Sequence, residues 1–425
     1  MTEGVTESVT AFRQRARAFI RANLEPLPSG GSSLARLRHK LTDEEELAGV
    51  AREREVQRML FDAKLAGICF PEQYGGLGLT IDHQRAFNEE IAGFDYPKRT
   101  QVPTFTPCAA VLLDFGTEEQ KLAHIPAMLK GEELWMQFLS EPGGGSDAAG
   151  ATTTATRDGD GWLLNGSKIW TTGAWWSDWG LVLARTNWDV PKHRGLSVFI
   201  LPIHQPGVDV HRIEMLDGSK EFCQEFLTDV RVPDSDRIGE VDDGWSIATR
   251  WLTHERMLFN SRYVTLPVGE ARGGAIDIAS VVQIARDVHR SDDPKVRELV
   301  GEVREIELVR GHLQRRVGQR IATRTFNDQA AAISRLYGGS TAVRASTIVF
   351  DIAGAVGGAW LPSEDASASH SGLEFLLRQS ACIGGGTTEM ARNVISERVL
   401  GMPRERALDK DVPFRDVPRG PASRA

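Results

Sequence analysis

The sequence predicts a multidomain protein of the α+β class, in which a β-domain separates two helical domains. Hydrophobic residues recur at helical spacing up to about Gly131, short alternating strands run from Glu133 to about Pro233, and amphipathic helices return after Gly244. We expect an all-α N-terminal domain, a central antiparallel β-barrel or sandwich, a C-terminal helical bundle and a short tail. The expected boundaries are 1–132, 133–240, 241–402 and 403–425.

The N-terminal part has the pattern of packed helices. Apolar residues near the start, Phe12 and Ile20 among them, recur at helix spacing, and a longer helical run covers 43–64. The segment from Thr117 to Gln120 predicts a capping box that opens another helix. The glycine-rich and proline-rich stretch 71–78 between these helices is expected to be a loop.

The central and C-terminal parts differ in period. A strand over 151–156, an Asp-Gly turn at 158–161 and a returning strand from Trp162 predict a hairpin, and further apolar strands follow. The later helices are expected over 244–262, 295–322, 326–358 and 386–399, which implies a bundle. The tail mixes proline with charged residues, so we expect it to be loosely held.

Composition excludes several classes of function. The 425 residues are 41% hydrophobic and 25% charged, with a formal net charge of -8, and the charges are interspersed, so no nucleic-acid partner or membrane insertion is expected. The N-terminus lacks the pattern of a secretory signal. The four cysteines are far apart and show no metal-binding or redox spacing, which favours a cytoplasmic protein without a metal site.

A glycine-rich loop follows the first predicted strand of the β-domain. Gly143-x-Gly145-x-x-Ala148 fits a dinucleotide fingerprint in spacing, but strands follow it where that fingerprint requires a helix. The glycines can still bring main-chain N–H groups close to a flavin or a pyrophosphate, with Ser140 and Ser146 as further donors. The residues alone do not distinguish such a loop from a tight turn.

Two motifs together resemble the flavin-binding signature of the acyl-CoA dehydrogenase family. They are Leu-Ser-Glu-Pro-Gly-Gly-Gly-Ser-Asp, ending at 147, and Asn-Gly-Ser-Lys-Ile-Trp-Thr-Thr, ending at 172. The loop at 71–78, the strand 226–233 and the helix 387–402 also resemble family segments in the expected order. The resemblance implies FAD at the junction of an N-terminal helical domain, a β-domain and a C-terminal four-helix bundle.

The resemblance also implies which residues contact the cofactor. Ser140 and the main chain of Gln137 and Leu139 would meet the pyrimidine side of the flavin, Trp170 would pack against its ring, and Thr172 would bond near N5. Gly145 and Ser146 would approach the pyrophosphate, while Thr387 and Glu389 would lie near the nucleotide. A tryptophan among so many others is ordinarily a core residue, and the neighbouring Thr172 is what favours the flavin role.

The family reaction needs a carboxylate to remove the α-proton of an acyl-CoA while the β-hydrogen leaves as hydride. Most members carry this base in the C-terminal loop, but here that loop has glycine at 385. A minority place it on the first bundle helix before an arginine, and Glu255-Arg256 matches that pattern. We therefore predict Glu255 as the base, Gly385 as a main-chain donor to the thioester carbonyl, and Ser146 and Arg256 as substrate contacts. A single glutamate is ordinarily a solvated helix acid; the missing loop acid favours the catalytic interpretation.

The implied partners are an acyl-CoA substrate and an electron-transferring flavoprotein, and the implied assembly is a homodimer or homotetramer active in fatty-acid β-oxidation. A flavin oxidase or monooxygenase of the same fold and a non-catalytic subunit of a heteromeric dehydrogenase are the alternatives. The usual arginine motif for intersubunit FAD contacts is absent, which leaves Arg286 and Arg290 as candidates, and 351–357 departs from the adenine-contacting pattern. The glycine-lined loop suggests room for long, branched or polycyclic acyl groups.

Overall fold

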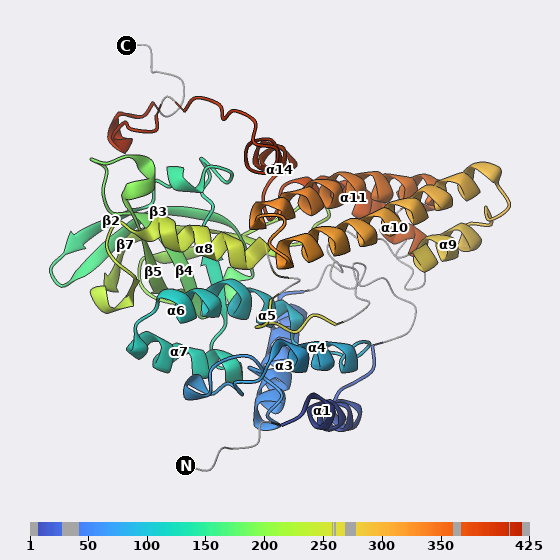
Figure 1. Ribbon diagram of the computed structural model, residues 1–425, viewed down its shortest axis with the longest axis horizontal. Helices are drawn as coiled ribbons and strands as arrows, with labels where there is room; N and C mark the ends of the chain where they lie inside the picture. Colours follow the sequence, from blue (N-terminus) through green and yellow to red (C-terminus); the bar gives the residue numbers. More distant parts are fainter. Residues whose placement is uncertain are drawn as a thin grey trace.

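The computed structural model describes residues 7–27, 42–256, 258, 261–267, 278–359, 367–407 and 409–418. A helical N-terminal part, a central β-sheet part and an elongated helical C-terminal part follow one another along the chain (Figure 1). This arrangement confirms the predicted fold class.

Helices cross one another in the N-terminal part. Their bounds are α1 Val9–Asn23, α3 Asp43–Asp62, α4 Ile81–Glu90, α5 Lys98–Pro103, α6 Ala110–Phe115 and α7 Glu118–Lys130, with a π-helical turn at Thr104–Ala109. The expected apolar residues Phe12 and Ile20 are buried between α1 and α4. The predicted capping box is confirmed, because Thr117 accepts from the Gln120 amide while the Gln120 side chain accepts from the Thr117 amide.

Eight strands form one sheet in the central part. They are β1 Trp135–Phe138, β2 Thr154–Asp158, β3 Gly161–Thr172, β4 Trp179–Arg185, β5 Leu196–Pro202, β6 Val208–Ile213, β7 Phe222–Pro233 and β8 Arg237–Ile238. The order is β6-β7-β3-β2-β4-β5-β8, with β1 beside β4. The predicted hairpin joins β2 to β3. The pairings are antiparallel as expected except at β4, to which β1 and β2 both pair in parallel. The glycine-rich loop connects β1 to β2 and contains a tight turn, in which the Gly144 N–H donates to the Glu141 carbonyl at 2.9 Å.

The two faces of the sheet contact different parts of the molecule. Trp162 on β3 meets Phe199 on β5 edge to face at 5.6 Å, although two strands separate them in the sheet order, so the sheet curves around an inner core. The alternate side chains of β4 and β5 face outward, and Leu181 and Val198 pack there with Ile247 and Trp251 of α8, Gly244–Arg256. The sheet is therefore the platform on which α8 lies.

The C-terminal helices pack mainly around α11. The remaining bounds are α9 Ile278–Asp287, α10 Pro294–Ala322, α11 Ala331–Ala353, α12 Ala355–Gly358, α13 Ser367–Leu377 and α14 Thr388–Val394. A core shared by α9, α10 and α11 contains Ile284, Val303 and Ile348. Helices α9 and α13 were not among the predicted segments, and the continuous helix expected over 326–358 is broken at Gly354, whose φ is +57°.

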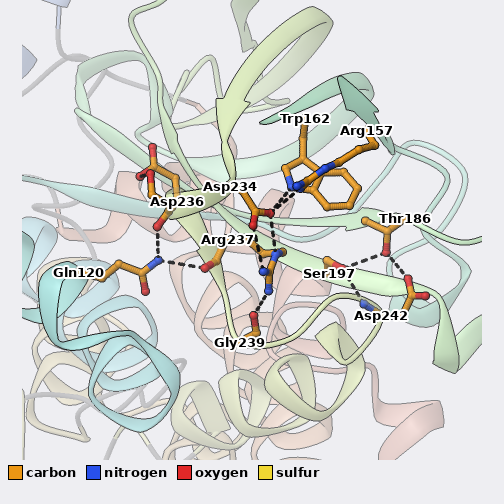
Figure 2. Close-up of polar contacts among 11 residues, drawn as sticks. Gln120, Arg157, Trp162, Thr186, Ser197, Asp234, Asp236, Arg237, Gly239 and Asp242 are labelled. Atoms are coloured by element: carbon orange, nitrogen blue, oxygen red, sulfur yellow. Dashed lines mark hydrogen bonds and ion pairs between the residues drawn. The ribbon is translucent and has the colours of Figure 1, made fainter. Parts of the chain in front are cut away.

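A polar cluster ties the β-domain to the N-terminal helices (Figure 2). Asp234 accepts hydrogen bonds from Trp162 Nε1 at 2.7 Å, Arg157 Nη1 at 2.8 Å and Arg237 Nε at 3.1 Å. These bonds and the adjacent cations hold the pKa of Asp234 well below its usual range. Gln120 of α7 donates to the main-chain carbonyl of Arg237 at 3.0 Å, so the segment after β7 is held from both sides.

The same segment then leads into α8. The main-chain N–H of Asp242 donates to Ser197 Oγ at 2.9 Å, and its carboxylate accepts from Thr186 Oγ1 at 2.6 Å (Figure 2). Gly244 follows, and a Cβ at that position would lie 2.6 Å from the Leu196 carbonyl. A close approach of the backbone to β5 therefore fixes where α8 begins.

The C-terminal tail crosses back from α14 to the β-domain (Figure 1). Phe414 is only 2% exposed and stacks on Trp188 at 5.4 Å, with the Arg185 guanidinium 3.8 Å from its ring centroid. Lys192 links Asp409 of the tail to Asp147 of the glycine-rich loop. The expectation of a loosely held tail is therefore corrected for 409–418, because one buried aromatic ring anchors it.

Replacing Phe414 with alanine should release this part of the tail. Truncating a buried phenylalanine costs about 3–5 kcal/mol. Here the cost cannot exceed the free energy with which the tail binds the β-domain, because the tail detaches once that free energy is lost. We expect trypsin to cleave the variant much faster after Lys410 in a timed digestion followed by mass spectrometry. Exposed Asp416 offers the control: Asp416→Ala should be cleaved like the wild type, and equal cleavage of all three proteins would contradict the anchoring role.

Candidate active site

Glu255 lies on the last turn of α8, on the side that faces β1. Gln137 of β1 accepts a hydrogen bond from Trp251 Nε1 at 2.5 Å, and its amide donates to the Glu255 carboxyl. Trp251, one turn earlier on the same helix, is fully buried. Burial raises the pKa of Glu255 above its ordinary value, and the charge of Arg256 and the Gln137 hydrogen bond oppose that rise only in part.

The C-terminal glycine loop meets α8 at this carboxyl. A Cβ built on Gly385 would lie 4.0 Å from Glu255 Oε1, although the two residues are 130 positions apart. Gly385 has a φ of +71°, a conformation that an L side chain rarely adopts. The structure therefore brings the two predicted catalytic positions together, and a side chain from the loop would enter the space beside the Glu255 carboxyl.

Trp170 is held in an unusual way near the end of β3. Its φ is +66°, and the pairing of β3 with β7 shifts register between Ile169 and Thr171. This bulge turns the indole outward, where it is 52% exposed and contacts Phe222 edge to face at 5.9 Å. Thr172 beside it is also exposed. A strained, exposed tryptophan is not a core residue; its open face and the adjacent hydroxyl suit a planar flavin ring.

The loop after β1 is bound to the same strand. The Ile169 N–H donates to the Ser140 carbonyl at 2.9 Å, which places Ser140 next to Trp170. A Cβ on Gly145 would lie 3.8 Å from Ser140 Oγ, so glycine there leaves the hydroxyl uncovered. Leu139 is half-buried and Ser146 is exposed. Ser140, one of the donors predicted from the glycine-rich motif, therefore lies beside the end of β3 that carries Trp170.

A buried ion pair links this loop to β3. Lys168 is fully buried and donates to Glu141 Oε1 at 2.8 Å. The Glu141 carboxylate also accepts from the amides of Thr152 at 2.6 Å and Thr153 at 2.9 Å. Although burial opposes it, the ammonium and these bonds lower the pKa of Glu141 to about 2. The ion pair thus joins both ends of the glycine-rich loop to β3.

A second buried acid also acts on the charge of Lys168. Glu225 of β7 accepts from Thr171 Oγ1 at 3.0 Å, and Thr171 lies between Trp170 and Thr172. Burial raises the pKa of Glu225 to about 7. Thr171 Oγ1 also lies 3.5 Å from the Gln137 carbonyl, so Gln137 connects the Trp170 strand to Glu255.

Other predicted residues make contacts of their own within the chain. The Thr387 hydroxyl caps α14 by accepting from the Met390 amide, and Glu389 is exposed and pairs with Arg392. Arg256 is exposed at the end of α8, where it contributes charge beside Glu255. Of the two candidates for the missing intersubunit motif, Arg290 donates to the main-chain carbonyls of Asp351 and Ile352, while Arg286 is exposed.

Two contributors to the site were not predicted from the sequence. The Gln137 side chain, which holds Glu255, was expected to act only through its main chain. Arg335 on α11 donates to the glycine loop at Gly384 and Gly386. For Gln137, the available signal was its place in the strand before the glycine-rich motif, where side chains alternate between the two faces of the sheet. Nothing in the local pattern around Arg335 distinguishes it from other helix arginines.

Among the described residues, no cluster of His, Cys, Asp and Glu could hold a metal ion. In the part of the chain that the structure covers, no helix combines the length and apolar character that a membrane crossing requires.

Comparison with protein families agrees with this geometry across the chain. Models of the N-terminal, middle and C-terminal domains of acyl-CoA dehydrogenase match residues 6–132, 137–230 and 242–400. The chain belongs to the acyl-CoA dehydrogenase family and is a flavin oxidoreductase.

Individual relatives cover most of the chain. The acyl-CoA dehydrogenase IpdE1 of Mycobacterium tuberculosis is 33% identical over 372 residues, covering 84% of this chain and 92% of the relative. FadE29 of the same organism is 30% identical, covering 85% and 91%. Among solved structures, the Tcur3481-Tcur3483 steroid ACAD superposes with a TM-score of 0.72 at 28% identity, covering 93% of this chain and 98% of that one. Butyryl-CoA dehydrogenase from Megasphaera elsdenii, at 22% identity and a TM-score of 0.66, shares the fold, covering 94% and 100%.

Proposed function

We propose that the protein is an FAD-dependent acyl-CoA dehydrogenase that converts an acyl-CoA to the trans-2-enoyl-CoA, with Glu255 on α8 as the base. The observation that carries this proposal is the 4.0 Å separation between Glu255 Oε1 and the side-chain position of Gly385. An acid on either element would reach the same space, and of the two facing positions, 255 and 385, the helix position is the one that carries an acid.

Each of these residues has its own role in the proposed reaction. Glu255 removes the α-proton, and its raised pKa brings the carboxyl closer to the weak acidity of its substrate. The Gly385 N–H donates to the thioester carbonyl and stabilises the enolate that develops there. Ser140, Leu139, Gly145, Trp170 and Thr172 hold the flavin, and Gln137 couples that strand to Glu255. When bound, FAD accepts the β-hydrogen as hydride.

An electron-transferring flavoprotein is the proposed electron acceptor, and β-oxidation in the cytoplasm the proposed setting. All four cysteines are free, in keeping with a reducing compartment. A flavin oxidase or monooxygenase of this fold is the second candidate. A monooxygenase has no need of a base aimed at an α-proton, whereas an oxidase differs from a dehydrogenase in the reaction of its reduced flavin with oxygen. Purified protein with bound FAD that is bleached anaerobically by acyl-CoA and reoxidises slowly in air would support the dehydrogenase; rapid peroxide formation would favour the oxidase.

A homodimer or homotetramer is proposed because one chain carries both the base and the flavin strand. The alternative is a non-catalytic subunit of a heteromer. Purification without FAD, or mixed-mass assemblies in native mass spectrometry after co-expression with a paralogue, would favour that alternative.

Long, branched or polycyclic acyl groups are the proposed substrates. A Cβ on Gly386 would meet nothing within 4 Å, so the loop beside Glu255 leaves open space. The name of one similar structure, the Tcur3481-Tcur3483 steroid ACAD, refers to a steroid, which is a polycyclic compound. In an anaerobic stopped-flow panel, we expect a polycyclic or branched acyl-CoA to reduce the flavin at least about 10-fold more efficiently than butyryl-CoA, the scale of discrimination by a few apolar contacts. A preference for butyryl-CoA would refute this substrate class.

A further inference from the structure

Arg335 of α11 reaches across to the glycine loop that faces Glu255. Its guanidinium donates three hydrogen bonds to main-chain carbonyls: to Ala381 at 2.8 Å, to Gly384 at 2.8 Å and to Gly386 at 2.9 Å. It forms no salt bridge with a described carboxylate. The five N–H groups of a guanidinium lie in a rigid plane, so three bonds of this length fix the loop in one conformation.

The chain next to Arg335 is shaped for this contact. Gly339 lies one turn further along α11, and a Cβ there would lie 2.7 Å from Arg335 Nη1 and 2.9 Å from the Ala381 carbonyl. Glycine in the middle of a helix costs about 0.5–1 kcal/mol relative to alanine. This glycine lets the loop and the guanidinium approach the helix closely.

The planar geometry of the peptide bond links the Arg335 contact to the direction of the Gly385 N–H. In a trans peptide the carbonyl of one residue and the N–H of the next point in opposite directions. Because Arg335 binds the Gly384 carbonyl, the Gly385 N–H points away from the guanidinium. No described residue accepts a hydrogen bond from that N–H. The donor is therefore oriented and left free, at the position whose Cβ direction faces Glu255.

We propose that Arg335 is a positioning residue that presents the Gly385 N–H to the thioester carbonyl, an inference that rests on the proposed dehydrogenase function. The positive charge of Arg335 at the Gly384 carbonyl also polarises the Gly384–Gly385 peptide and so increases the partial positive charge on the Gly385 N–H. Both effects stabilise negative charge on the carbonyl oxygen, which develops only as the α-proton leaves.

The test compares Arg335→Gln and Arg335→Lys with a matched control, Arg344→Gln. Arg344 lies on the same helix and pairs with Glu302 at the surface. The probe is a 3-thia-acyl-CoA, which can lose its α-proton but cannot be dehydrogenated. Its long-wavelength absorbance with the flavin, followed against pH, gives the apparent pKa of the bound ligand. FAD content, melting temperature, acyl-CoA affinity and amide exchange of 381–387 are measured on the same samples.

We expect Arg335→Gln to raise the apparent pKa of the bound ligand and to slow flavin reduction by about 10²-fold, the effect of removing one oxyanion donor. FAD content and substrate affinity should change little, amide exchange in the loop should rise, and lysine should rescue part of the loss. Ligand acidity in Arg335→Gln equal to that of the wild type and Arg344→Gln would overturn the proposal while leaving the dehydrogenase function standing. If the wild type itself does not acidify the ligand, the proposed function fails and Arg335 with it.

Discussion

Glu255→Gln is expected to slow flavin reduction by acyl-CoA by at least about 10²–10⁴-fold, the contribution of a well-placed general base. Glutamine keeps the shape and the hydrogen-bonding capacity towards Gln137 but cannot accept the α-proton. The rate is read as the decay of oxidised-flavin absorbance in an anaerobic stopped-flow experiment at saturating substrate. Glu255→Asp, which keeps the acid but withdraws it by one methylene, should fall between the two.

The fold should tolerate Glu255→Gln. The pKa of the Glu255 carboxyl is raised in the folded protein, so its ionised form destabilises the fold above that pKa, and a neutral isostere removes this cost. We expect a melting temperature at neutral pH no lower than that of the wild type, with normal FAD content. A near-normal rate in the folded, flavin-loaded variant would contradict the assignment.

The pH dependence of the wild type follows from the same shift. A base works in its ionised form, so the rate of flavin reduction should rise with pH through the Glu255 pKa, and the acid limb should lie above pH 4.5. Glu255→Gln should lose this limb from whatever slow reaction remains.

The second large effect is on stability. Lys168→Met should lower the free energy of unfolding by about 3–5 kcal/mol, because it leaves the buried Glu141 carboxylate without its cation. Denaturant unfolding of the flavin-loaded protein measures the loss. Since the folded-state pKa of Glu141 is about 2, its contribution is present above the unfolded value of 4.5 and is lost as pH falls towards 2, so the difference between variants should shrink in acid.

The double variant Glu141→Gln/Lys168→Met is the control for this ion pair. Removing both charges leaves neither member of this ion pair buried without its partner, so the double variant should be more stable than Lys168→Met alone. If Lys168→Met unfolds within about 0.5 kcal/mol of the wild type, the range of an ordinary surface change, the ion pair does not have the role given to it.

Much of the fold is local in origin and could be predicted. The capping box at Thr117 and the hairpin at 158–161 depend on neighbouring residues, and both are present as expected. The parallel pairing of β1 with β4 depends on a long connection, and no alternation pattern reveals it. Likewise, Phe414 is one aromatic residue among prolines and charges, and only the distant Trp188 makes it an anchor.

The site divides in the same way. The proximity of Glu255 and Gly385 agrees with the pairing inferred from the two motifs. The outward turn of Trp170 comes from a bulge in the pairing with β7, a register shift that the sequence of β3 alone does not encode. Arg335 acts through carbonyls about 50 residues away, so its role is a property of the packed helix and loop.

We propose that Glu255, and not a loop residue, removes the α-proton. The most direct measurement is the exchange of the α-hydrogens of a 3-thia-acyl-CoA with D₂O on the flavin-loaded enzyme, followed by NMR. This exchange needs the base but no hydride transfer. We expect the wild type to catalyse it and Glu255→Gln to slow it by at least about 10²-fold. Exchange at the wild-type rate in folded Glu255→Gln would show that another group takes the proton.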